Sequence, residues 1–261
     1  MLPDPKEYAY YTPSDTIVIL GAVPQEIPLI TRDMKALKQD ILWGIPYWQG
    51  TLHDKPVVVA ITGIGKTFTG MTTALFVETF KPRIVVMTGT GARINKTLRT
   101  GDVIVANATI EHDYGSLTAD GMVYRPLQGP INGNEVKNIV SPGKKYLLLA
   151  QKAMDSYPPQ TVTADGNTYT NAVRFGVVAS SDLFGVTERR IKLLREEYST
   201  DIMEMESAPL AHVCKAMGVP YLIVRSGSNR AQEAPNTDYL RLGPIAAEEA
   251  ARFTHHLVSL L

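Results

Sequence analysis

Short apolar runs alternate with longer amphipathic segments along most of the 261-residue chain. The runs are rich in valine and isoleucine, a pattern typical of strands that are buried within a sheet. Such strands are predicted at residues 16–21, 56–62, 83–87, 102–106, 172–180 and 220–225. Apolar residues at helical spacing predict helices at residues 24–38, 66–80, 144–156, 187–198, 205–217 and 244–261. This alternation of strands and helices predicts an α/β fold.

No internal repeat or linker divides the chain, so one domain is expected over residues 16–261, preceded by an N-terminal extension, residues 1–15. Small residues at 88–92 (TGTGA) predict a turn where backbone can approach a ligand closely. Residues 114–143 contain many Gly, Pro and Asn residues without a sustained period, and are expected to form long surface loops.

The charge balance argues against a polyanionic partner. Lys plus Arg and Asp plus Glu both number 26, so there is no surplus of positive charge for nucleic acid or an anionic membrane. A small neutral ligand fits better. Neither a secretory leader nor a membrane-spanning run is visible, which predicts a cytoplasmic protein, although an exported form with a removed signal peptide stays open. The single cysteine, Cys214, is expected to be a core thiol.

Residues 60–67 (AITGIGKT) resemble a relaxed form of the glycine-rich loop that binds nucleotide phosphates. Ala60 and Ile61, however, fit the interior of a strand, which leaves the loop too short to wrap a triphosphate. The next strand ends in Met87 and Thr88 instead of a magnesium-binding acid. The segment therefore does not predict a nucleotide hydrolase.

An acidic segment, residues 201–207 (DIMEMES), places Glu204 and Glu206 among apolar residues where a strand meets a helix. One interpretation is a helix cap with a solvated acid beside it, favoured by the positive end of the helix. The other is a carboxylate that accepts hydrogen bonds from two vicinal hydroxyls, such as those of a ribose. The segment alone leaves both interpretations open.

Further short segments stand in a specific order along nearly the whole chain. They are residues 21–26 (GAVPQE), 63–66 (GIGK), 88–91 (TGTG), 101–105 (GDVIV), 112–113 (HD), 181–184 (SDLF), 204–206 (EME), 211–214 (AHVC) and 224–229 (VRSGSN). In order and spacing they resemble the purine nucleoside phosphorylase superfamily, and within it the 5′-methylthioadenosine/S-adenosylhomocysteine nucleosidases. The resemblance implies a three-layer α/β/α sandwich with a mixed, twisted central sheet. It also implies a homodimer in which the segment after His112 approaches the neighbouring pocket, and cleavage of a purine nucleoside without a cofactor.

The same resemblance implies roles for individual residues. Glu206 would hold the ribose 2′ and 3′ hydroxyls, Met205 would lie against the sugar, and Phe184 would stack on the purine. Glu26 would activate the attacking water as a general base, although a helix first-turn acid is the plainer interpretation. The remaining residues expected around the substrate are Thr90, Gly91, Glu204 and Ser228.

Asn229 departs from the nucleosidase pattern, which has an aspartate able to give its proton to purine N7. Asparagine can donate a hydrogen bond but cannot transfer a proton, so general acid catalysis worth roughly 10²–10⁴-fold would be lost. Three outcomes remain: a slower hydrolase of adenine nucleosides, a hydrolase of 6-oxopurine nucleosides, or a protein that binds nucleosides without cleaving them.

Water or phosphate could be the nucleophile. Glu26 favours water, as does Met87, which stands where the bacterial hexameric phosphorylases have arginine. Phosphorolysis is the alternative, with Arg93 or another basic side chain binding phosphate.

Other candidates have plainer interpretations. Asp182 either touches the base or caps a turn. His255 and His256 are adjacent on a helix, and the five histidines show no metal-ligand spacing, so no metal is predicted. No nucleophilic-serine elbow occurs in the sequence.

Overall fold

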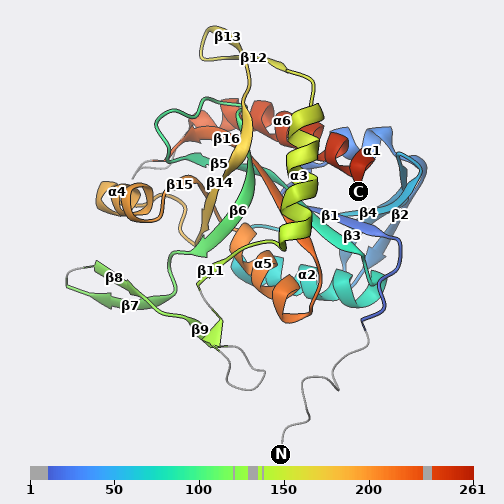
Figure 1. Ribbon diagram of the computed structural model, residues 1–261, viewed down its shortest axis with the longest axis horizontal. Helices are drawn as coiled ribbons and strands as arrows, with labels where there is room; N and C mark the ends of the chain where they lie inside the picture. Colours follow the sequence, from blue (N-terminus) through green and yellow to red (C-terminus); the bar gives the residue numbers. More distant parts are fainter. Residues whose placement is uncertain (1–10, 120, 129–134, 137, 232–236) are drawn as a thin grey trace, which may run out of the picture.

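The computed structural model describes residues 11–119, 121–128, 135–136, 138–231 and 237–261 (Figure 1). The main sheet has ten strands among these residues. They are β1 (Ile17–Gly21), β2 (Lys35–Leu42), β3 (Ile45–Leu52), β4 (Lys55–Ile61), β5 (Ile84–Arg93), β6 (Val103–Glu111), β11 (Ile139–Val140), β14 (Val173–Ser180), β15 (Thr200–Glu204) and β16 (Tyr221–Arg230). The helices are the 3₁₀ turn η2 (Pro24–Glu26), α1 (Pro28–Asp33), α2 (Lys66–Phe80), α3 (Lys144–Ser156), α4 (Glu188–Glu197), α5 (Ser207–Ala216) and α6 (Asp238–Leu260).

The sheet is mixed, as predicted. Its order is β11-β6-β14-β15-β5-β1-β4-β3-β2, and β16 pairs with both β5 and β6. The pairs β1–β4, β1–β5, β5–β16, β6–β14 and β14–β15 are parallel, whereas β5–β15, β6–β16, β2–β3 and β3–β4 are antiparallel. Strands β5, β16, β6, β14 and β15 therefore pair in a closed circuit. This circuit draws the ends of β5, β15 and β16 together.

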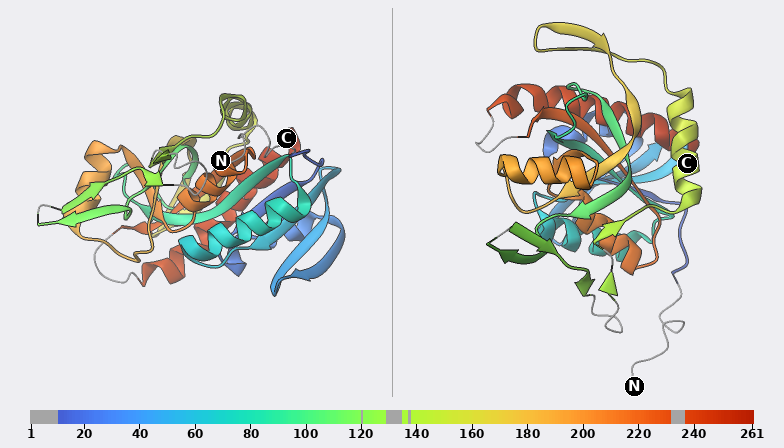
Figure 2. Two further views of the ribbon diagram at one scale, coloured as in Figure 1. Left: turned by 90° about the horizontal axis from the view of Figure 1, so that it is seen from below. Right: turned by 60° about the vertical axis from the view of Figure 1, so that its left-hand side comes forward.

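Helices cover both faces of the sheet, which confirms the three-layer sandwich (Figure 2). Alternate residues of each strand point to opposite faces. Ile17 and Ile19 of β1 belong to a core cluster that includes residues of α1, α3 and α6. Val18 and Leu20 belong to a second cluster, which includes residues of α2 and α5. These strands are buried on both faces, which explains their continuous apolar runs.

The helix predicted at residues 24–38 is wrong beyond its first turns. The chain forms η2 and α1, and then turns outward as β2, which pairs with β3 to form a hairpin at the edge of the sheet. Trp43 and Gly44 at the hairpin turn have φ angles of +52° and +83°. Strand pairing with β3 outweighs the local helical spacing, because it satisfies backbone groups along the edge of the sheet.

The turn predicted at residues 88–92 is also wrong, because these residues continue β5. Their small size has another cause. A Cβ at Gly89 would lie 2.6 Å from Oε1 of Glu26, and one at Gly91 would lie 2.9 Å from the carbonyl oxygen of Met203. The glycines therefore make room for neighbouring groups at the strand ends.

The loops predicted at residues 114–143 are partly wrong. Two strands, β7 (Gly115–Thr118) and β8 (Gly121–Tyr124), form a hairpin, and β9 (Leu127–Gln128) pairs with β10 (Glu135–Val136). Residues 120, 129–134 and 137 lie outside the described part, as do residues 1–10 of the expected N-terminal extension. A second hairpin, β12 (Thr161–Ala164) with β13 (Asn167–Thr170), has no counterpart in the sequence prediction.

Helix α2 and helix α3 have the predicted bounds, but α6 begins at Asp238, before the predicted start at Pro244. Pro244 lies inside the helix, where it removes one backbone hydrogen bond. Within the described residues, no helix is both long enough and apolar enough to cross a bilayer.

Candidate functional site

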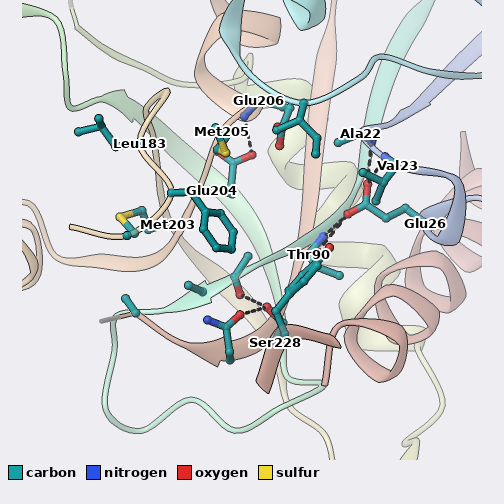
Figure 3. A pocket seen from close by; sticks show the side chains of 18 residues that line it. Ala22, Val23, Glu26, Thr90, Leu183, Met203, Glu204, Met205, Glu206 and Ser228 are labelled. Carbon is teal, nitrogen blue, oxygen red and sulfur yellow. Dashed lines mark hydrogen bonds between the residues drawn. The ribbon is translucent and has the colours of Figure 1, made fainter. Parts of the chain in front are cut away.

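One pocket opens where β1, β5, β15 and β16 end (Figure 3). Its empty space, counted with the solvent-open mouth, is about 800 Å³. Every site residue predicted from the sequence lines it: Glu26, Thr90, Gly91, Phe184, Glu204, Met205, Glu206, Ser228 and Asn229. The fold thus brings together residues that are spread over most of the chain.

Glu26 lies at the end of the 3₁₀ turn that follows β1 and is only 2% exposed. Its Oε2 accepts hydrogen bonds from the backbone N–H groups of Ala22 and Val23, at 2.7 and 3.3 Å. Its Oε1 accepts from the backbone N–H and the hydroxyl of Thr90, at 2.9 and 3.2 Å. All four partners are hydrogen-bond donors. They hold the Glu26 carboxylate at the pocket wall, where both of its oxygens accept hydrogen bonds.

Glu206 stands at the start of α5 and is buried. Its Oε1 accepts a hydrogen bond from the backbone N–H of Gly65 at 3.0 Å, and its Oε2 lies 3.3 Å from Nη2 of Arg225. Burial raises the pKa of Glu206 well above its usual range, and the charge of Glu204 raises it further. Arg225 and the Gly65 N–H oppose this rise in part.

Glu204 lines the same pocket, but protein donors surround its carboxylate. It accepts from the backbone N–H groups of Glu206 and Ser207, at 3.0 and 2.9 Å, and from the hydroxyls of Ser207 and Ser180. It also forms an ion pair with Arg225. These bonds satisfy the first N–H groups of α5, so Glu204 acts as the cap of that helix.

Arg225 is a site residue that the sequence interpretation did not single out. It is fully buried on β16 and bridges Glu204 and Glu206. Its Nε donates to the Ser207 hydroxyl at 3.0 Å. The available signal was an arginine inside the apolar run of β16, because a buried cation needs carboxylate partners.

Asn229 and Ser228 lie at the end of β16, facing Gly91 of β5. The amide nitrogen of Asn229 donates to the carbonyl of Arg230 at 3.1 Å. The Ser228 hydroxyl lies 3.0 Å from the carbonyl oxygen of Gly91 and 3.0 Å from Oδ1 of Asn229. Asn229 is also among the residues that line the pocket.

Apolar side chains form the outer wall of the pocket. Phe184, in the segment between β14 and α4, is 62% exposed, and Leu183 beside it is 42% exposed. Ile64, Met203 and Tyr239 complete this wall. An exposed aromatic ring at a pocket mouth offers a surface on which a flat ligand can stack.

The remaining predictions concern residues that do not line the pocket. Oδ1 of Asp182 accepts from the backbone N–H of Lys66 at 2.7 Å, so this residue caps the start of α2. Cys214 is a buried free thiol, as expected. His255 pairs with His53 and Asp33, and no cluster able to hold a metal occurs among the described residues.

No lysine, arginine or histidine is among the described residues that line the pocket. Arg93, the proposed phosphate ligand of the phosphorolysis alternative, is not part of the lining, and its Nη1 donates to the carbonyl of Leu98 at 3.3 Å. Arg225 is buried behind the wall and is paired with two carboxylates. The lining that the structure describes therefore has no cationic side chain to bind a free phosphate ion.

Comparison with known proteins places this geometry in a family. The chain is 28% identical to a 5′-methylthioadenosine/S-adenosylhomocysteine nucleosidase of Psychromonas ingrahamii, over 94% of this chain and 99% of that protein. The nucleosidase of the same name from Neisseria meningitidis, solved with methylthio-immucillin-A, superposes with a TM-score of 0.80 at 26% identity, covering 95% of this chain and 100% of that one. Futalosine hydrolase of Helicobacter pylori superposes with a TM-score of 0.79 at 27% identity, covering 95% and 98%. The family model described as the phosphorylase superfamily matches residues 16–259, and the chain therefore belongs to that superfamily.

Proposed function

We propose that the chain is a purine nucleosidase, which hydrolyses the N-glycosidic bond of a purine nucleoside to free base and a ribose derivative. The observation that carries this proposal is the convergence of Glu26 and Glu206 in one pocket whose described lining has no cation. The names of its relatives, 5′-methylthioadenosine/S-adenosylhomocysteine nucleosidase and futalosine hydrolase, support the same reaction class.

The positions of these groups support the following mechanism. The Glu206 carboxylate accepts hydrogen bonds from the ribose 2′ and 3′ hydroxyls, and its charge stabilises the positive charge that grows on the sugar. Glu26 takes a proton from water as the water oxygen bonds to the anomeric carbon. The bond between that carbon and purine N9 breaks, and its electron pair leaves with the base. Asn229 donates a hydrogen bond to the departing purine, which takes its proton from solvent.

A nucleoside panel assayed with and without inorganic phosphate tests this function, with free base and free sugar as the readouts. The panel contains 5′-methylthioadenosine, S-adenosylhomocysteine, inosine and futalosine. We expect base release that does not depend on phosphate, together with a free sugar. A sugar 1-phosphate would establish phosphorolysis. Tight purine binding without release from any nucleoside would establish a binding protein.

A second candidate, hydrolysis of 6-oxopurine nucleosides, is favoured by the presence of Asn229 in the pocket lining. An asparagine amide has two N–H groups, and only one of them can serve the bond to the Arg230 carbonyl, so the other is available to a ligand as a donor. A 6-oxopurine presents two adjacent acceptors, N7 and O6, to such a donor. A 6-aminopurine presents an acceptor beside a donor.

The Asn229→Asp substitution distinguishes the two base classes. It restores a group that can protonate N7, so we expect kcat for 5′-methylthioadenosine to rise roughly 10²–10⁴-fold. Hydrolysis of inosine should rise less, because its base relies on the N–H donor near O6. Steady-state rates for both substrates measure the change. An unchanged rate for both would remove Asn229 from the leaving-group role.

We also propose that the chain is a homodimer. Phe68 and Met71 of α2 are 56% and 50% exposed, and Val123 of β8 and Ile139 of β11 are similarly exposed. In Figure 1, α2 and the β7–β8 hairpin both lie along the lower side of the molecule. A second copy would cover these apolar side chains. His112 is itself buried, so in the proposed dimer the chain after it would approach the neighbour.

Met71→Asp should raise the dimer dissociation constant at least roughly a hundredfold, because association would bury an unpaired carboxylate. Analytical ultracentrifugation measures this constant. Leu148→Asp, at a 57% exposed position on α3, is the matched control and should leave it unchanged. A monomeric wild-type protein would contradict the dimer. The cytoplasmic location and the single-domain boundary at residue 16 stay predictions.

A further inference from the structure

Lys66, the lysine of the segment that resembles a phosphate-binding loop, has two carboxylate partners. Its Nζ lies 2.7 Å from Oε1 of Glu111 and 2.7 Å from Oδ1 of Asp113. The three side chains are 21%, 8% and 14% exposed. Burial lowers the pKa of Lys66, but its hydrogen bonds to Asp113 and Glu111 outweigh that effect and raise it. The ammonium group therefore remains a cation, and it donates hydrogen bonds to two side chains of the protein.

The hydrogen bonds continue from Lys66 to the apolar wall of the pocket. Oδ2 of Asp113 accepts from the backbone N–H of Asp182 at 2.8 Å. Oδ1 of Asp182 accepts from the backbone N–H of Lys66 at 2.7 Å, which closes a ring through Lys66, Asp113 and Asp182. Asp182 directly precedes Leu183 and Phe184, the exposed side chains of that wall. The ring thus holds the segment that presents Phe184.

The same ring reaches the other side of the pocket through one peptide group. Gly65, directly before Lys66, donates its N–H to Oε1 of Glu206 at 3.0 Å. Gly65 has a φ of +92°, and a Cβ there would lie 2.9 Å from Oδ1 of Asp182. A side chain at this position would be strained and would press on the ring. Gly65 lies close to Asp182 and is hydrogen-bonded to Glu206, so it connects the two sides of the pocket.

Phe184 and Leu183 bury too little surface to hold their segment by packing alone. Hydrogen bonds and ion pairs therefore have to hold this segment in place. A cation shared by two largely buried carboxylates is suited to this task, because linked hydrogen bonds fix direction as well as distance.

We propose that Lys66 is a positioning residue, whose network with Asp113 and Asp182 sets the purine-stacking wall and the ribose carboxylate in one geometry. This inference rests on the proposed function and identifies what aligns its two subsites. Because both subsites are then ordered before the substrate binds, less of the binding free energy is lost to ordering the pocket.

Lys66→Met tests the proposal, with Lys66→Arg as the conservative variant and Lys192→Met as the control. Lys192 lies on α4 with a 68% exposed side chain, 4.0 Å from Glu196. We expect Lys66→Met to raise KM roughly tenfold with a smaller fall in kcat, and Lys66→Arg to recover most of the loss. Lys192→Met should match the wild type. Thermal unfolding and oligomeric state are measured for each variant, and if Lys66→Met does not fold, Asp113→Ser replaces it.

A double-mutant cycle sharpens the test. If Lys66 acts through the wall, Lys66→Met combined with Phe184→Ala should cost less than the product of the two single effects. Lys66→Met combined with Asn229→Ala should give the full product. Independent effects in the first cycle, or an unchanged KM in Lys66→Met, would overturn the proposal while leaving the nucleosidase function intact.

Hydrogen exchange gives a readout that does not need turnover. The backbone amides of Lys66 and Asp182 should exchange at least roughly tenfold faster in Lys66→Met than in the wild type or in Lys192→Met. Equal exchange in all three proteins would overturn the positioning role. Faster exchange in a protein that cleaves no nucleoside would support that role and refute the proposed function, so the two failures are distinguishable.

Discussion

Glu26→Gln is expected to lower kcat for base release by roughly 10²–10⁴-fold, the usual contribution of a general base. Glutamine keeps the length of the side chain but cannot take a proton from water. Its amide nitrogen would also face N–H donors, because the backbone groups of Ala22, Val23 and Thr90 all point at the carboxylate. The expected result is therefore a loss of turnover with part of the substrate binding retained.

Single-turnover rates and equilibrium binding of 5′-methylthioadenosine separate these two effects for Glu26→Gln. Gln25→Ala is the matched control, because Gln25 belongs to the same 3₁₀ turn but is exposed and lies outside the pocket lining. It should retain the wild-type rate. Full turnover in Glu26→Gln would show that water is activated elsewhere.

Glu206→Gln is expected to lower kcat/KM by roughly 10²–10³-fold, because in the proposed mechanism it removes the carboxylate that stabilises the developing cation on the ribose. Glutamine can still accept one hydrogen bond from a hydroxyl, but it cannot accept from two with the strength of a carboxylate. The Arg225 cation would also lose one of its two partners.

Deoxynucleosides identify the contact that Glu206→Gln removes. The wild type should discriminate strongly against 2′-deoxy and 3′-deoxy analogues, and the variant should discriminate much less, because the carboxylate that read the hydroxyls is gone. Glu248→Gln, on an exposed part of α6, is the control. Equal discrimination in wild type and variant would place the ribose grip on another residue.

The pH profile gives a second test of Glu206. Its pKa is raised by burial and by Glu204, so the carboxylate becomes protonated at a higher pH than an ordinary glutamate. Activity that needs the ionised form should fall as the pH is lowered through this raised pKa. In the Glu206→Gln variant, the residual activity should lack that limb of the profile.

Much of the fold was predictable from the sequence because buried strands and amphipathic helices leave local patterns. The bounds of α2 and α3 and the alternation of layers follow from apolar spacing that the chain carries within a few turns. The site residues were predictable for a different reason. The resemblance to a known family extends over many short segments. It therefore identifies site residues that lie far apart in the sequence but close together in the fold.

Two of the errors have one cause, which is that contacts with distant parts of the chain override local preference. The edge strand β2 forms where the apolar spacing is helical, because β3 is available to pair with it. The small residues around Gly89 and Gly91 indicated a turn, whereas they leave room within β5 for Glu26 and for the backbone of Met203. No local pattern records what approaches a residue from another strand.

The sequence by itself determined the layered α/β architecture, and its resemblance to a known family indicated nine of the residues that line the pocket. Only the tertiary structure decided what each carboxylate there can do: Glu204 is saturated by the start of α5 and by Arg225, Glu26 is held by four donors, and Glu206 keeps a side toward the pocket. The physical reason is that a buried carboxylate is defined by its donors, and those donors come from strands and turns far along the chain.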